Sequence, residues 1–167
     1  MLLYHPAFDT YHSAFRLLLL MWNSNDREMH FARLRILDFY LLFPAELESV
    51  SFPRSILREK TRWKNLRNRY NQITDPRRVF DELASFQLSG MQTLLSTGLA
   101  VQKGESDVVS LSREAVPAQL VPELESAIAA RAELLNLLTG PFKNIDLYGK
   151  DGLKARTGLF EYRYDPV

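Results

Sequence analysis

The sequence has 167 residues, of which 46% are hydrophobic and 25% are charged, and its formal net charge at pH 7 is +1. This length suffices for one hydrophobic core, and we expect a single domain over residues 1–167. A net charge near zero excludes a uniformly basic nucleic-acid-binding protein. Because the chain contains no cysteine, disulfides, zinc–thiolate sites and thiol nucleophiles are excluded as well.

A run of apolar residues from Leu17 to Trp22 raises the question of a membrane span. The run is far shorter than the about 20 residues that a membrane-spanning helix needs. The segment before it has neither a basic start nor a small-residue cleavage site, so we expect no signal peptide. These features predict a cytoplasmic protein without membrane contact.

The first part of the chain predicts two helices. From Phe8 to Trp22, apolar and aromatic residues recur at three- and four-residue spacing, which is typical of the buried stripe of an amphipathic helix. A second helix is expected over residues 27–43 and is apolar on nearly every side from Phe31 onward. Such a helix is buried on several faces, and Pro44 ends it.

Residues 54–78 form a basic segment with nine Lys and Arg against Glu59 and Asp75, which gives a local charge of +7 and leaves −6 for the rest of the chain. Ile56 and Trp63 lie on one helical stripe, and we expect a basic amphipathic helix over residues 54–72. Its cations are candidates for contact with nucleic acid or an acidic partner, and the alternative is a solvated face. These cations are Arg54, Arg58, Arg62, Lys64 and Arg69.

Residues 79–112 predict two short helices, at 79–83 and 86–95, followed by a β-hairpin. The strands of the hairpin are expected at 99–102 and 108–111. Helix, helix and hairpin in this order are typical of a winged helix-turn-helix.

The predicted fold class is therefore mainly α with a small β-hairpin: a winged helix-turn-helix-like core with additional N- and C-terminal helices. The core would span about 27–112 with the basic helix inserted, and segment 34–43 would be its first helix. A C-terminal helix is expected at 120–139, ended by a Gly-Pro pair. The tail, 140–167, alternates like an edge strand at 160–164.

His5, Asp9 and His12 are spaced so that they could meet on one face of the first helix, as in a metal facial triad. The alternative is structural, with His12 inside an aromatic stripe and Asp9 serving the first helical turn. We favour the structural interpretation and expect no metal.

Asp38 lies among apolar residues, where a carboxylate with a raised pKa would mark general acid/base chemistry. The alternative is an ion pair with Arg16, Arg33 or Arg35, or a place at a polar rim. Neither GxSxG nor GxxxxGK[ST] occurs in the chain. We therefore expect no catalytic residue and no cofactor.

The predicted winged helix is poorly equipped to read DNA. From Val79 to Gln102 the chain has no Lys or Arg, and its only amides before Gln102 are Gln87 and Gln92. Groove reading needs Arg, Lys, Asn or Gln at base edges, and phosphate contact dominates affinity. Any DNA contact is therefore expected to be non-specific and to involve the basic segment.

Two aromatic-rich blocks, one near the N-terminus and one ending at Pro44, resemble those of the middle component of bacterial ABC-three-component (Lamassu-type) anti-phage defence systems. They cover about the first quarter of the chain. The signature residues, taken as structural, are His5, Pro6, Phe8, Asp9, Tyr11, His12, Phe15, Arg16, Asp38, Phe39, Tyr40, Phe43 and Pro44.

The resemblance implies a non-catalytic adaptor subunit that links an SMC/Rad50-like ABC ATPase to an effector, often a nuclease. The complex would act in bacterial anti-phage or anti-plasmid defence. The first alternative is a winged-helix DNA-binding transcription regulator. The second is a small metal-dependent hydrolase that uses His5, Asp9 and His12.

Overall fold

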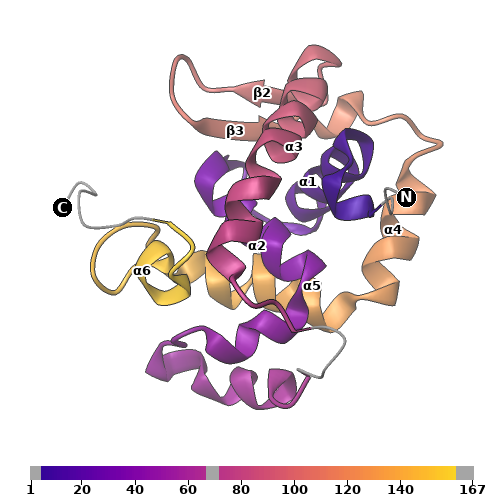
Figure 1. The fold of residues 1–167 in the computed structure, drawn as a ribbon. Coiled ribbons are helices and arrows are strands. Elements are labelled where there is room, and N and C mark those ends of the chain that lie inside the picture. Colours follow the sequence, from indigo (N-terminus) through magenta and orange to yellow (C-terminus); the bar gives the residue numbers. More distant parts are fainter. Residues whose placement is uncertain (1–4, 67–71, 161–167) are drawn as a thin grey trace.

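The computed structural model describes residues 5–66 and 72–160, which are mainly helical with one small antiparallel sheet (Figure 1). The predicted fold class is confirmed at this level. The α-helices are α1 (Thr10–Asn23), α2 (Phe31–Leu42), α3 (Pro76–Ser96), α4 (Val121–Ala130), α5 (Ala132–Thr139) and α6 (Leu153–Thr157). The strands are β1 (Glu28–His30), β2 (Ala100–Gln102) and β3 (Val108–Leu111), and the 3₁₀ helices are η1 (Pro6–Phe8), η2 (Pro44–Ser49), η3 (Arg54–Trp63), η4 (Arg113–Ala115) and η5 (Pro141–Asn144).

The sheet has the strand order β1-β3-β2, with both pairs antiparallel. The predicted β2–β3 hairpin is confirmed, whereas β1 was not expected. The helix predicted to begin at residue 27 begins at Phe31, because Met29 pairs with Val109 and the chain is extended there. The Nδ1 of His30 then caps α2 by accepting from the amide of Ala32 at 3.1 Å.

Helix α3 is continuous over 21 residues, so the predicted division into helices at 79–83 and 86–95 is wrong. Neither proline nor glycine separates the two predicted pieces, so nothing in the local sequence breaks the helix. Asp75 caps the helix by accepting from the amide of Arg78 at 3.1 Å, and Pro76 occupies the first turn. The turn of a helix-turn-helix is therefore not at the predicted place.

The predicted basic α-helix over 54–72 is also wrong in the part that the structure describes. Residues Arg54–Trp63 form η3, which is kinked at Ile56 and contains no buried residue. Asn65 then takes a left-handed conformation with φ of 61°, and residues 67–71, including Arg69, lie outside the described residues. In an α-helix, Glu59 and Lys60 would lie on the same face as Ile56 and Trp63. This face therefore buries too little apolar surface to stabilise an α-helix.

The predicted C-terminal helix is broken at Arg131, which has φ of −135° and separates α4 from α5. The guanidinium of Arg131 donates to the carbonyl of Leu41 at the end of α2. This tertiary contact accompanies the break, in a region without a glycine or proline between Glu123 and Thr139. Of the predicted edge strand at 160–164, only Phe160 is described.

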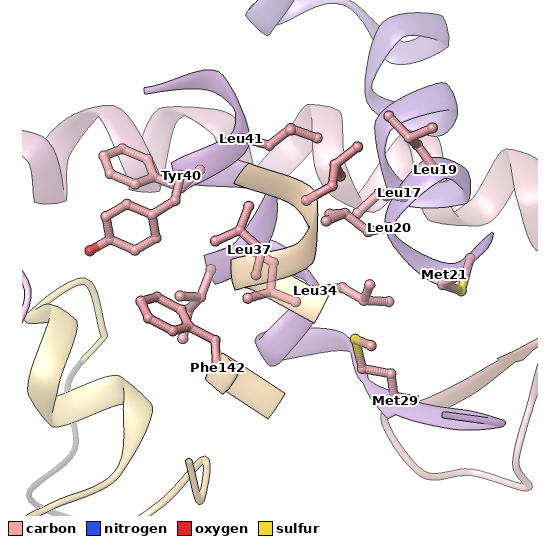
Figure 2. Close-up of a cluster of buried hydrophobic side chains, with 14 of the residues drawn as sticks. Leu17, Leu19, Leu20, Met21, Met29, Leu34, Leu37, Tyr40, Leu41 and Phe142 are labelled. Atoms are coloured by element: carbon pink, nitrogen blue, oxygen red, sulfur yellow. The ribbon is translucent and has the colours of Figure 1, made fainter. Parts of the chain in front are cut away.

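The core centres on α2, which contacts α1, α3 and α5. Figure 2 shows Leu17 and Leu20 of α1 gathered with Leu34 and Leu37 of α2, beside Phe142. All five side chains are fully buried. The prediction that α2 is buried on several faces is confirmed, because every residue from Ile36 through Leu41 is buried. Among the described residues, no helix is both long and apolar enough to cross a lipid bilayer.

Candidate interaction surface and signature network

An ion pair joins the two signature blocks. Nε of Arg16 in α1 donates to Oδ1 of Asp38 in α2 at 2.6 Å, and Nη2 donates to Oδ2 at 3.2 Å. The Asp38 side chain is fully buried and that of Arg16 is 10% exposed. The guanidinium also donates to the Ser13 hydroxyl at 3.0 Å and to the Pro6 carbonyl at 3.3 Å. Because solvent does not reach Asp38, this carboxylate holds helices together and is not placed to act on a substrate.

Gln87 of α3 completes the network from the third helix. Its amide nitrogen donates to Oδ2 of Asp38 at 2.9 Å and to the carbonyl of Arg35 at 3.2 Å. Its amide oxygen accepts from Nε of Arg35 at 2.9 Å. The Arg35 guanidinium lies over the rings of Phe80 and Phe160, at 4.6 and 4.9 Å from their centroids. One polar network therefore connects α1, α2 and α3 inside the fold.

Gln87, one of the two amides counted as candidates for contact with base edges, is fully buried, so that interpretation is wrong for this residue. Its position could have predicted this burial, because Gln87 lies in the buried stripe of α3, four residues after Leu83 and four before Met91. A lone amide at such a position predicts a buried polar partner. Only the fold shows that the partner is Asp38.

The three residues of the candidate metal triad serve local roles. His5 is the N-cap of η1, where Nδ1 accepts from the amide of Ala7 at 3.1 Å. Asp9 caps α1 by accepting from the amide of His12 at 2.9 Å, and its carboxylate lies 3.0 Å from Nδ1 of His12. Within the ranges that the structure describes, no three His, Cys, Asp or Glu side chains are grouped so that they could hold a metal ion.

The aromatic signature residues divide between core and surface. Phe39 and Tyr40 are buried, and the ring of Phe39 packs edge-on against Phe80 at 5.9 Å. By contrast, the side chains of Tyr11 and Phe8 are 79% and 37% exposed. The remaining aromatic residues of the signature, Phe15 and Phe43, are half-buried, and Pro44 begins η2.

The basic residues lie on the surface around η3. Arg54, Arg58, Arg62 and Lys64 are all exposed. We define the η3 surface as the exposed cations and leucines of residues 54–66: Arg54, Leu57, Arg58, Arg62, Lys64 and Leu66. The fifth predicted contact residue, Arg69, lies outside the described residues.

The outward side of α3 carries no cation beyond its first turn. Asp81 and Glu82 are exposed near its N-terminal end, and Glu82 pairs with Arg78 at 3.0 Å. Further along, Leu88 is 49% exposed. With Gln87 buried, Gln92 is the only exposed amide of this helix among the described residues. This side is therefore electrostatically unfavourable for a phosphate backbone.

The C-terminal segment is tied to the core through α2. Nη1 and Nη2 of Arg33 donate to the carbonyls of Phe142 and Ile145 at 3.0 and 2.8 Å. Burial lowers the pKa of Arg33, and the carboxylates of Asp26 and Asp146 act in the opposite direction. The half-buried Arg33 thus positions the loop beside η3.

His30 also ties this segment to the core. Its Nδ1 accepts from Ala32 and therefore carries no proton, so its Nε2 carries one and donates to the Tyr148 hydroxyl at 2.9 Å. Burial lowers the pKa of His30, Lys154 and Arg33 lower it further, and Asp107 opposes them.

The fold and these contacts define a mainly helical protein in which the signature residues His5 and Asp9 cap helices and Arg16 and Asp38 belong to a buried polar network. The family described as ABC-three component (ABC-3C) system Middle Component 5 matches residues 2–165. The chain therefore belongs to this family, which confirms the predicted relationship to middle components of ABC-three-component systems. Comparisons with curated proteins and with solved structures find no match.

Proposed function

We propose that this protein is a non-catalytic adaptor subunit that links an SMC/Rad50-like ABC ATPase to an effector in a Lamassu-type anti-phage or anti-plasmid complex. Membership of the middle-component family is the observation that carries the proposal. In this proposal, the middle component contributes to its system by binding the other components.

The use of the signature residues supports this role. Asp38, the carboxylate that could have marked an active site, is hydrogen-bonded to Arg16 inside the fold. His5 and Asp9 cap helices. Chemistry would need such groups to converge on an accessible reacting atom, whereas binding needs only the exposed surface. Cytoplasmic localisation belongs to the same proposal.

Co-purification from cells that express the complete system tests the adaptor role. The tagged chain is expected to retain both the ATPase and the effector. It is expected to lack nuclease and ATPase activity when purified alone. A chain that retains neither component under native conditions would overturn the proposal.

A second candidate function, a winged-helix DNA-binding regulator, is favoured by the order of elements. The order α1-β1-α2-α3-β2-β3 and the strand order β1-β3-β2 are compatible with a winged helix in which α3 would be the helix presented to DNA. The exposed carboxylates of Asp81 and Glu82 oppose this role. A gel shift with the promoter of its own operon distinguishes the two functions: binding that is lost in Gln92→Ala would favour the regulator.

A further inference from the structure

The cations of the η3 surface are largely unused by the fold. Within the described ranges, the side chains of Arg54, Arg58 and Lys64 make no hydrogen bond and no ion pair. Arg62 has only a loose contact with Glu59 at 3.7 Å. Four exposed cations along eleven residues raise the local positive potential, and an anionic ligand would lower it.

Lys60, a cation of the same stretch, makes contacts within the fold. Its ammonium donates to the carbonyl of Val50 at 2.8 Å and lies 5.7 Å from the centre of the Phe52 ring. The exposed cations make no comparable contact, although they lie on the same short element. Their free charge is therefore available to a ligand.

Apolar side chains lie among these cations. Leu57 is 52% exposed and Leu66 is 38% exposed, although η3 as a whole contains no buried residue. Beside the start of η3, a hollow of about 570 Å³ is lined by Pro53 and Ile56 on one side and by the 141–156 segment, with Asp146 and Asp151, on the other. Apolar contact is therefore offered by Leu57 and by the edge of the hollow at Ile56, close to the cations of η3.

This combination distinguishes between two kinds of anionic ligand. A phosphate backbone is recognised by cations and hydrogen-bond donors, and exposed leucines contribute nothing to that contact. Protein interfaces instead have an apolar centre and a polar rim, with charge complementarity across the contact. The 3₁₀ geometry also works against a phosphate contact: a step of four residues, as from Arg58 to Arg62, advances about a third of a turn. Arg58 and Arg62 therefore do not line up along one side of the helix.

We propose that the η3 surface binds an acidic segment of a partner protein that carries apolar side chains between its Asp and Glu residues. The apolar side chains would cover Leu57 and the edge of the hollow at Ile56, while the carboxylates would pair with Arg54, Arg58 and Lys64. This inference rests on the proposed adaptor function, because it assigns to that function one contact with another component of the system.

The test uses the full chain co-expressed with the other components of its system. Two variants change the two halves of the proposed contact: Arg58→Glu reverses a free charge and Leu57→Ser removes an apolar side chain. The matched control is Arg27→Glu, which reverses an exposed cation next to β1, away from η3. Circular dichroism and thermal unfolding are expected to be unchanged in all three, because neither cation makes a side-chain hydrogen bond or ion pair within the described residues and Leu57 is half exposed.

We expect Arg58→Glu and Leu57→Ser each to reduce the amount of one retained component by about tenfold, the effect of a contact worth about 1.4 kcal/mol. Arg27→Glu should retain the wild-type amount. Retention of every component by both variants overturns the inference but leaves the adaptor function intact. If the wild-type chain retains no component, the adaptor function and the inference fail together.

A second measurement tests the nucleic-acid alternative directly, by the fluorescence anisotropy of a short labelled duplex DNA at physiological salt. We expect no saturable binding by the wild-type chain. Binding that Arg58→Glu abolishes and Leu57→Ser leaves unchanged would overturn the inference, because the surface would then recognise phosphate by charge alone.

Discussion

Gly90 of α3 lies so close to Ala14 of α1 that a Cβ atom built on Gly90 would be 2.8 Å from the backbone nitrogen of Ala14. The same atom would lie 3.0 Å from Cβ of Ser13. The two helices therefore approach each other at a point where only glycine fits, and the clash is with backbone that no rotamer change can move.

The first prediction concerns this contact. Gly90→Ala should destabilise the protein by about 1–2 kcal/mol, because overpacking against a backbone costs more than the about 1 kcal/mol that alanine contributes to helix propensity. The measurement is urea unfolding followed by circular dichroism. Ser85→Ala, at an exposed position of the same helix, is the control and should not lower stability. A midpoint for Gly90→Ala equal to or above that of the wild type would contradict the packing described.

The second prediction concerns the buried pair of Arg16 and Asp38. Asp38→Asn removes the negative charge and leaves the guanidinium buried and unpaired, so we expect a loss of about 3–5 kcal/mol in the free energy of unfolding. The double variant Arg16→Met with Asp38→Leu should cost less than the two single changes added, because it removes both charges.

The exposed pair of Arg78 and Glu82 supplies the control for this experiment. Glu82→Gln is expected to change stability by less than about 0.5 kcal/mol, since an exposed ion pair contributes little. A similar small effect for Asp38→Asn would show that Asp38 is not the buried centre of the network.

The third prediction concerns Arg33 and the C-terminal segment. Arg33→Met removes the donors to the carbonyls of Phe142 and Ile145 and should cost about 2–3 kcal/mol, because both carbonyls lose a charged donor. Limited proteolysis followed by mass spectrometry is expected to show faster cleavage within residues 142–160 than in the wild type. Uniform cleavage along the chain would indicate global destabilisation in place of local release.

The fourth prediction concerns pH and His30. Because burial lowers its pKa in the folded state below the ordinary 6.5, the unfolded chain binds this proton first as pH falls. The contribution of His30 to stability is therefore complete above pH of about 6.5 and decreases as pH falls below that value. Protonation of Nδ1 would also displace the amide of Ala32 and place a positive charge at the start of α2.

His30→Asn provides the comparison, because asparagine can cap a helix but does not titrate. The unfolding free energies of the wild type and this variant are measured at pH 7.5 and at pH 5.5. We expect the wild type to lose more stability than the variant over this interval. Equal losses would show that His30 does not carry this part of the pH dependence.

The site was predictable only in part. The sequence predicted three candidate ion-pair partners for Asp38, namely Arg16, Arg33 and Arg35, since a carboxylate among apolar residues needs a nearby cation. That the partner is Arg16, and that Gln87 shares it, depends on how α1 and α3 cross α2. Likewise, the exposure of Arg54, Arg58, Arg62 and Lys64 agrees with a solvated charge run, but their arrangement around a 3₁₀ helix in place of an α-helix was not expected.

By itself, the sequence determined the helical class, the β2–β3 hairpin and the relationship to middle components, because periodicity and motif residues are properties of neighbouring positions. The predicted buried stripe of α1 is wrong at Tyr11 and His12, which are exposed. The tertiary structure alone decided that Glu28–His30 pairs with β3 and that the C-terminal helix breaks at Arg131. These two outcomes depend on partners distant in the sequence: a strand that supplies hydrogen bonds and the carbonyl of Leu41. Local patterns favour a helix or a strand at a given place in the chain. Which elements pack against each other is determined only by the packing of the whole chain.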